Sequence, residues 1–258
     1  MKSFIYGFFM AWGMFLSVPC PVRIWDEKAR GRMLACLPLT GGIAGGLWVL
    51  IAWLILIIKV PKFIGTLVLA AFPFLITGFI HLDGFMDVCD AVLSRRDREE
   101  RIRILKDSHC GAFAVICLIL LMLFQWAMFL SADIKNISLI SLALIPVSVR
   151  ACAGIAVTAL KPMKSSQYAK KDANAGNASA EKPKNTLNLI ILSVLLLVSA
   201  ALPFIFDGLR GFAPAAACCA YWLAVLSVYR QFGGISGDIS GFALTIGEFA
   251  GIAVLCLT

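Results

Sequence analysis

The sequence predicts an all-α, polytopic integral membrane protein with about seven transmembrane helices, a short N-terminal apolar helix and one domain spanning residues 1–258. Hydrophobic residues make up 60% of the chain and charged residues 15%, and the mean hydropathy is +0.90. Soluble domains carry about 25% charged residues. Apolar runs of transmembrane length recur along the whole chain, which places it in a lipid bilayer.

The first apolar run, residues 4–18, is short for a helix that needs about 20 residues to span a bilayer. It resembles a signal peptide, but no small-residue cleavage motif follows Pro19 and Pro21. We expect this run to be retained, either spanning the membrane or lying in its interface. Seven longer runs are the predicted transmembrane helices: 34–58, 63–82, 112–131, 137–160, 187–206, 212–229 and 241–257.

The loops between these runs differ in charge. Most Lys and Arg residues fall in one alternating set of loops, at 23–32, 95–106, 161–184 and Arg230, and few fall in the opposite set. Under the positive-inside rule the first set faces the cytosol, so we expect a multi-pass protein of the inner (cytoplasmic) membrane. The net charge of +8 then suits lipid headgroups, and no nucleic-acid partner is expected.

Two of the predicted cytosolic segments have distinct compositions. Residues 94–109 are densely charged and predict an amphipathic helix on the membrane surface. Residues 161–186 are polar, with few large apolar side chains, and predict a flexible loop.

Glycines in the run 40–46 form two overlapping G-x-x-x-G pairs, Gly41 with Gly45 and Gly42 with Gly46. Small residues at this spacing allow two helices to approach closely. Helix packing is the main interpretation, and a ridge that makes room for a bulky ligand is the alternative.

A row of carboxylates follows the third apolar run. Asp83, Asp87 and Asp90 are spaced i, i+4, i+7, so they share one stripe of a helix. Three like charges beside the hydrocarbon layer need a positive partner. Mg²⁺ is the natural candidate, because it binds carboxylate oxygens and bridges them to substrate phosphates. We therefore predict a metal and catalytic site at these acids.

Other polar residues within or beside the apolar runs are further site candidates. Arg150, inside a predicted span, needs either a carboxylate or a substrate phosphate as its partner. Glu248 is an intramembrane acid in the last span, and such acids are site candidates. His81 adjoins the acid stripe and could serve as a general base, orient a ligand or simply form a hydrogen bond at a helix end.

Two loops complete the predicted site. Asp107 could cap the next helix or extend the metal site, in which case Lys106 would pair with a phosphate. The glycine-rich run 233–241 could expose backbone N–H groups to phosphate oxygens. Its candidate substrate-binding residues are Gly233, Gly234, Gly237 and Asp238.

At these residues the chain resembles the cobalamin synthase family, adenosylcobinamide-GDP ribazoletransferase. The most specific part of the resemblance is the pair H-L-D-G-x-x-D-x-x-D and G-G-x-x-G-D, in this order on a polytopic chain. The matching stretches run nearly end to end: Phe15 to Pro19, Leu37 to Gly41, His81 to Asp90, Lys106 to Ser108 with Gly111, Val149-Arg150, and Gly233 to Asp238 with Glu248.

The resemblance implies a Mg²⁺-dependent transfer of the adenosylcobinamide-phosphate moiety of adenosylcobinamide-GDP to α-ribazole or its 5′-phosphate, with release of GMP. Asp83, Asp87 and Asp90 would hold the metal and the diphosphate, and one of them would accept the proton of the attacking hydroxyl. Lys106, Arg150 and the loop 233–237 would steady phosphate charge. A homo-oligomer is left open. The chain departs from the usual family pattern at Val18, Ala91 and His109.

Two other functions compete with this reading. CDP-alcohol phosphotransferases, which make phospholipids, need an Ala-Arg pair where this chain has Val88 and Cys89. A cation or metabolite transporter could use the acids as an ion path, but such proteins often contain inverted repeats, and no convincing repeat is present here.

Overall fold

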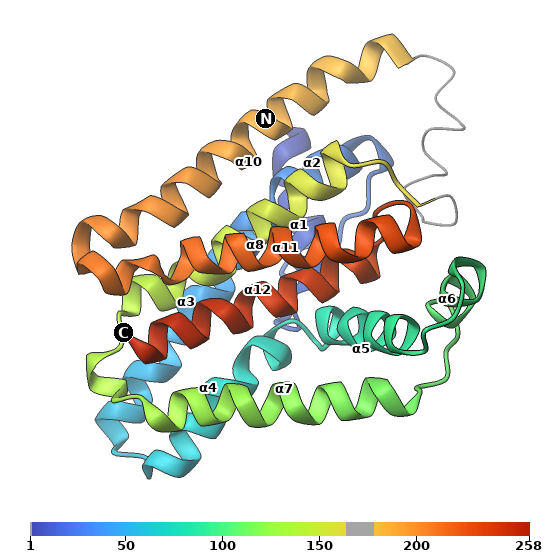
Figure 1. The fold of residues 1–258 in the computed structure, drawn as a ribbon. Helices are drawn as coiled ribbons and strands as arrows, with labels where there is room; N and C mark the ends of the chain where they lie inside the picture. The colour runs from blue at the N-terminus through green and yellow to red at the C-terminus, as the bar shows by residue number, and fades with distance from the viewer. Residues whose placement is uncertain (1, 164–177) are drawn as a thin grey trace.

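The structure, a computed structural model, describes residues 2–163 and 178–258, with only the backbone course given for 178–185. It confirms the all-α class, with long helices lying side by side (Figure 1). The described α-helices are α1 (Lys2–Phe15), α2 (Arg30–Ala35), α3 (Leu37–Ile58), α4 (Lys62–Ile76), α5 (Ile80–Leu93), α6 (Arg98–Ile104), α7 (Ala112–Ser131), α8 (Leu139–Ala159), α10 (Ala178–Asp207), α11 (Ala213–Phe232) and α12 (Gly237–Leu257).

Within the described ranges, five helical stretches are long and apolar enough to cross a membrane, or up to six if α4 and α5 together form one bent span. The protein is therefore polytopic, as predicted. The longest stretch, Thr186–Phe232, contains both α10 and α11, and this accounts for the difference from the predicted seven once the bent pair is counted. Helix α1 has 14 residues and is not among these stretches.

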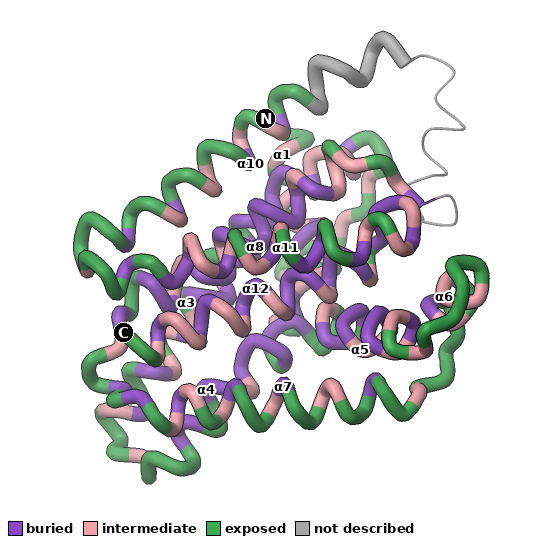
Figure 2. The backbone as a smooth tube through the Cα atoms, in the orientation of Figure 1, coloured by how far each residue is buried: buried purple, intermediate pink, exposed green. Residues whose placement is uncertain are grey.

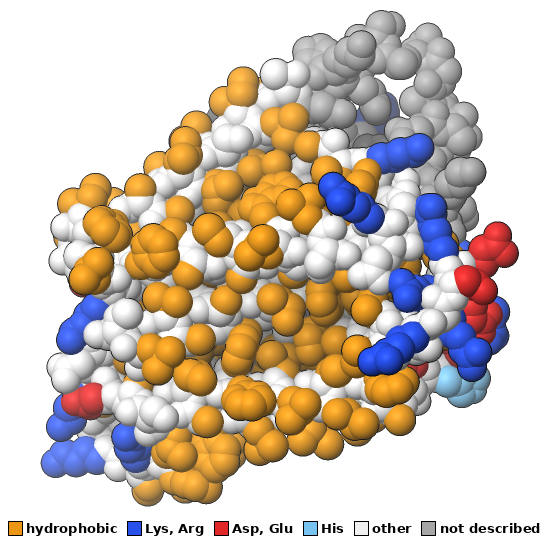
Figure 3. Space-filling view, in the orientation of Figure 1, with side chains coloured by type: hydrophobic (Ala, Val, Ile, Leu, Met, Phe, Trp, Pro, Cys, Tyr) orange, Lys and Arg blue, Asp and Glu red, His pale blue; other side chains and the backbone are white. Residues whose placement is uncertain are grey.

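The centre of the bundle is formed by α8 and α12. In their most apolar windows 67% and 61% of the residues are buried, against 22% in α7 (Figure 2). Large apolar side chains on α7 are instead exposed, as expected for a helix that faces lipid. Figure 3 shows a broad apolar band on this face, with Lys and Arg gathered at its two ends.

The G-x-x-x-G pairs divide into a packed face and an open face. A Cβ at Gly41 or Gly45 would overlap the backbone of α8, at Pro146 and Ala143 respectively, whereas a Cβ at Gly42 or Gly46 meets nothing within 4 Å. The helix-packing interpretation therefore holds for Gly41 and Gly45.

These neighbouring glycines allow a matched test of packing. We expect Gly45→Ala to destabilise the protein by about 1–3 kcal/mol, because the added methyl forces α3 away from α8. Gly46→Ala should be neutral or slightly stabilising, because alanine favours the helix and meets no neighbour. Thermal unfolding of both variants in detergent checks this, and equal melting temperatures would contradict it.

The prediction of one continuous helix over residues 63–82 is wrong. The chain breaks between α4 and α5, and the two axes differ by 89°. The break lies at Gly78 and Phe79, whose φ values of +59° and +64° cannot continue a right-handed helix. As a result α5 starts at this exposed turn, directly before the acid stripe.

The broken end of α4 is completed by the segment after α1. Ser17 donates its hydroxyl to the carbonyls of Leu75 (2.8 Å) and Ile76 (3.1 Å), and its backbone N–H also donates to Ile76 (2.8 Å). Terminal carbonyls of a helix have no partner within the helix, and in a membrane an unpaired carbonyl is costly. The segment 15–19 therefore fixes the position at which α5 begins.

Of the two predicted cytosolic segments, 94–109 is described throughout and 161–186 only in part. Within 94–109 the structure has α6, which packs on the end of α11: Arg98 donates to the Phe232 carbonyl (3.1 Å) and Arg101 to Gln231 (2.6 Å). Most of the predicted loop 161–186 lies outside the described residues. Of the rest, Pro162 forms a β-bridge with Ile235, and α10 begins at Ala178, inside the predicted loop.

Candidate functional site

The two motifs of the sequence meet where α5 crosses the start of α12. A Cβ at Gly84 would lie 2.8 Å from the Asp238 carbonyl oxygen and 2.9 Å from its Cα. One turn further along α12, Gly241 lies against His81, where a Cβ would be 3.3 Å from the His81 carbonyl oxygen. Glycine at both positions is what allows the acid stripe and the glycine-rich motif to share one site.

This contact can be tested without touching a charged group. Gly84→Ala should separate α5 from α12, because the Asp238 backbone cannot yield as a flexible side chain would. We expect a loss of about 1–3 kcal/mol in stability and a clear loss of turnover. Gly42→Ala is the matched control, since its Cβ meets nothing within 4 Å. Full activity and stability of Gly84→Ala would contradict this account of the contact.

The acid stripe lies along α5 as the spacing predicts. Asp83 is exposed, and Asp87 and Asp90 are half-buried. Asp87 interacts electrostatically with Asp83, Asp90 and Asp238, so the second motif adds a fourth carboxylate to the group. Among the described residues no Lys or Arg forms an ion pair with the three acids of α5. The site therefore concentrates negative charge, which a bound cation would neutralise.

The loop that contains Lys106 and Asp107 reaches the acid stripe at Gly111. Gly111, the residue before α7, lies against Asp90 so closely that a Cβ there would overlap the Asp90 carboxylate. Asp107 and Lys106 are exposed. Asp107 accepts hydrogen bonds from the backbone and ring of His109 (3.0 and 2.6 Å), which hold the pKa of its carboxyl below the usual range. It thus forms a local turn rather than the cap of α7.

A cavity of about 190 Å³ opens beside the contact of α5 with α12. Its polar lining includes Asp83 and His81 from α5, Arg150 from α8, and Gly237 and Asp238 from α12. A larger cavity of about 510 Å³, lined by the break between α4 and α5, shares Asp83 with it. Five predicted site residues from three helices therefore line one space.

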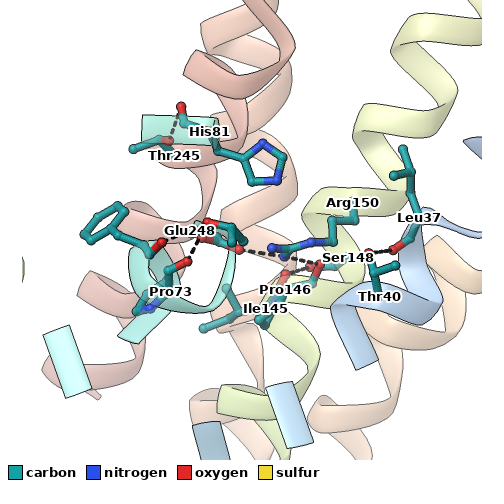
Figure 4. Close-up of polar contacts among 12 residues, drawn as sticks. Leu37, Thr40, Pro73, His81, Ile145, Pro146, Ser148, Arg150, Thr245 and Glu248 are labelled. Carbon is teal, nitrogen blue, oxygen red and sulfur yellow. Dashed lines mark hydrogen bonds and ion pairs between the residues drawn. The ribbon is translucent and has the colours of Figure 1, made fainter. Parts of the chain in front are cut away.

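Arg150 and Glu248 form a buried ion pair within the bundle (Figure 4). Arg150 Nη1 lies 2.8 Å from Glu248 Oε1 and donates a second bond to the Pro146 carbonyl (3.1 Å). The two side chains are 1% and 6% exposed. The sequence left open whether Arg150 pairs with a carboxylate or a phosphate. Its Nη1 atom pairs with a carboxylate.

His81 is held in place from two sides. Its ring stacks on Phe15 of α1, with centroids 5.9 Å apart, and its carbonyl accepts a hydrogen bond from Thr245 of α12 (3.3 Å). Figure 4 shows the His81 ring turned toward the side of the site where Arg150 lies. Its Nε2 atom is buried without a hydrogen-bond partner among the described residues.

Two of the predicted glycines occupy structural positions. Gly233 ends α11 with φ +72°, and its Cα faces the Arg98 guanidinium of α6. Gly234 lies against the backbone of Met163, where a Cβ would be 2.4 Å from the Met163 nitrogen. Neither residue lines the cavity, whereas Gly237, the first residue of α12, does.

No preformed metal cage is present in the part of the chain that the structure describes, where no three His, Cys, Asp or Glu side chains group closely enough to hold an ion. The seven-residue step from Asp83 to Asp90 covers about 10 Å of helix, so these acids do not converge on one point. Mg²⁺ does not require such convergence, because it usually takes one or two carboxylates, with waters and substrate phosphates completing the shell. The oxygen donors fit a Mg²⁺ site of that open kind.

Several residues that shape the site escaped the sequence reasoning as site residues. Phe15 and Thr245 position His81, and Ser236 caps α12 by accepting from the Ile239 N–H (3.2 Å). Ser236 could have been found from its S-x-x position before a helix. Nothing local in the sequence places Phe15 or Thr245 beside a histidine.

Comparison with known proteins identifies close relatives of the whole chain. The family model described as Cobalamin-5-phosphate synthase matches residues 7–256. An adenosylcobinamide-GDP ribazoletransferase of Clostridium botulinum (strain Alaska E43 / Type E3) is 37% identical, with 100% of this chain and 99% of the relative covered. Proteins of the same name from Clostridium perfringens (strain 13 / Type A) and Lachnoclostridium phytofermentans are 35% and 30% identical, covering 99% and 98% of this chain and 99% and 94% of each relative. No solved structure matches the chain.

Proposed function

Because this chain belongs to the cobalamin-5-phosphate synthase family, we propose that its site performs the reaction named for its relatives, with adenosylcobinamide-GDP as donor and α-ribazole or its 5′-phosphate as acceptor. The observation that carries the proposal is the contact of Gly84 with Asp238. This contact brings Asp83, Asp238 and the start of a 21-residue helix into one cavity wall, and Asp87 interacts electrostatically with both of these acids. Such a wall suits a diphosphate and a metal ion.

The transfer is a substitution at phosphorus. The 3′-hydroxyl oxygen of the ribazole attacks the donor phosphorus that carries the cobinamide, the bond from that phosphorus to the bridging oxygen breaks, and GMP leaves with that oxygen. The hydroxyl proton passes to a carboxylate of the α5 stripe. Asp87 is the best-placed acceptor, because it is half-buried between Asp83, Asp90 and Asp238, and neighbouring negative charges favour uptake of a proton.

Mg²⁺, when bound to one or two of the stripe carboxylates, would neutralise charge that develops on the phosphate oxygens. Asp83 and Asp87 are the proposed principal ligands, with Asp90 steadied beside Gly111. Residues elsewhere in the chain position these carboxylates. The turn at Gly78 and Phe79 sets the direction of α5 and so the position of the stripe, and the segment around Ser17 holds that turn.

We further propose that the site opens toward the cytosol. Helix α6, with its many arginines, lies at the same end of the bundle as the end of α5 and the start of α12 (Figure 1). An excess of Lys and Arg marks the cytosolic side, and nucleotide substrates are made there. The lipid-forming and transport alternatives gain no support, because the matched relatives are ribazoletransferases over their full length.

A turnover assay tests the proposal. Protein in nanodiscs is given adenosylcobinamide-GDP, α-ribazole 5′-phosphate or α-ribazole, and Mg²⁺, and both GMP and the corrinoid product are followed. We expect equal amounts of the two products, and none when Mg²⁺ is removed by chelation. Absence of product from folded protein with either acceptor would overturn the proposed function.

A further inference from the structure

The Arg150 guanidinium has more donors than the protein uses. Glu248 and the Pro146 carbonyl both engage Nη1, whereas Nε and Nη2 are buried without a hydrogen-bond partner among the described residues. Leaving buried donors of a charged group unpaired is expensive, and native proteins rarely do so without a reason. Arg150 is only 1% exposed and lines the 190 Å³ cavity, so this unused capacity lies beside that space.

His81 adds a third unpaired group to the same cavity. Its buried Nε2 also lacks a partner in the described part of the chain, and the His81 side chain interacts electrostatically with Arg150. Two side chains that line one cavity, from α5 and α8, thus each carry buried nitrogen atoms without a partner in the described part of the chain. A single oxygen-rich group placed between them would satisfy both.

We infer that Arg150 and His81 form a buried subsite for one phosphate group of a substrate, with Glu248 as the residue that positions Arg150. The Nε–H and Nη2–H groups of an arginine form a fork that matches two oxygens of a phosphate. Because Glu248 holds the guanidinium by its other nitrogen, the fork stays aimed while the pair remains neutral inside the bundle. Glu248, a site candidate from the sequence, then acts through Arg150 and binds no substrate directly.

The size and charge of the cavity agree with one phosphate group. A volume of about 190 Å³ is large enough to hold one phosphate group. Asp83 and Asp238 line the same cavity and repel an anion. The subsite should therefore bind phosphate well only when a divalent cation offsets these carboxylates.

The identity of the phosphate rests on the proposed function. Donor and acceptor can each supply one: the donor through its diphosphate and the acceptor through the 5′-phosphate of α-ribazole 5′-phosphate. The chemistry that Arg150 recognises is the same in both cases. Kinetics with the phosphorylated and the unphosphorylated acceptor separate the two sources.

Arg150→Lys is the test variant, because it keeps the charge and removes the fork. If the acceptor phosphate binds here, the KM for α-ribazole 5′-phosphate should rise by about tenfold or more, while the KM for α-ribazole stays the same. If the donor phosphate binds here, the KM for adenosylcobinamide-GDP should rise similarly with both acceptors. Arg210→Lys is the matched control, since Arg210 bonds Thr258 at the other end of α12.

A binding measurement makes the subsite testable apart from turnover. Inorganic phosphate with Mg²⁺, at constant ionic strength against chloride, should raise the melting temperature of the wild type and of Arg210→Lys, and should not raise that of Arg150→Lys. Glu248→Asp, which keeps the charge but withdraws the carboxylate by one methylene, should weaken the same response and serves if Arg150→Lys does not fold.

The outcomes separate the two proposals. Equal stabilisation of the wild type and Arg150→Lys by phosphate, with KM values that differ by less than about twofold, would overturn the subsite. Phosphate stabilisation that depends on Arg150, together with no turnover by the wild type, would overturn the proposed function and leave the subsite standing.

Discussion

Asp87→Asn should reduce turnover by about 10²–10³-fold or more, because it removes both a metal ligand and the proposed proton acceptor. The substitution keeps the size of the side chain and one of its two oxygens. It lowers the negative charge shared with Asp83, Asp90 and Asp238, so the fold should not suffer. The rate of GMP release at saturating substrates, measured across a Mg²⁺ titration, checks this expectation.

Asp133→Asn is the matched control for this loss. Asp133 lies between α7 and α8, where its Oδ1 accepts from the Lys135 N–H (3.2 Å), a bond that an asparagine oxygen can also accept. Its Oδ2 accepts from Asn136 Nδ2 (2.9 Å), an exposed bond that the variant loses far from the acids of α5. It should therefore retain the rate of the wild type. If Asp87→Asn kept more than about a tenth of that rate, Asp87 would hold neither role.

Glu248→Ala should cause the largest loss of stability of any single change discussed. It leaves the Arg150 guanidinium buried and unpaired, and breaking a buried pair in this way costs about 3–5 kcal/mol. Removing both charges, in the double variant Glu248→Ala with Arg150→Met, should recover much of the loss, since no buried charge remains. Thermal unfolding in one detergent gives the comparison for all variants.

The exposed pair of Glu100 with Arg103 provides the control for that experiment. Its atoms are 2.6 Å apart, closer than those of the buried pair, but the side chains are 35% and 69% exposed. Glu100→Ala should change the melting temperature little, because exposed ion pairs contribute little. Similar decreases in melting temperature for Glu100→Ala and Glu248→Ala would contradict the claim that burial of Arg150 makes the loss of its partner costly.

The sequence was sufficient to predict the stripe on α5 and the presence of α12, because both depend on local spacing. Three acids at i, i+4, i+7 share a helix face whatever surrounds them. The break between α4 and α5 was missed for the opposite reason. Residues 63–82 are apolar throughout, and the two positive φ values at Gly78 and Phe79 depend on contacts with Ser17, far away in the chain.

The arrangement of the polar residues within the site also required the fold. The sequence left open whether Arg150 pairs with a carboxylate or a phosphate, and Glu248 lies 98 residues further along the chain. The sequence alone also could not show which glycines of the run 233–241 line the cavity. Only the structure shows that Gly233 ends α11 and that Gly234 packs against the backbone of Met163, while Gly237 lines the cavity.

The most direct test of the account asks whether the α5 carboxylates hold a metal against the donor phosphates. Mn²⁺ replaces Mg²⁺ in protein reconstituted in nanodiscs with adenosylcobinamide-GDP, and pulsed electron paramagnetic resonance measures the coupling of bound Mn²⁺ to phosphorus. The account predicts phosphorus coupling in the wild type and its loss, with the bound Mn²⁺, in Asp87→Asn. The same bound Mn²⁺ and the same phosphorus coupling in Asp83→Asn, Asp87→Asn and Asp90→Asn would contradict it.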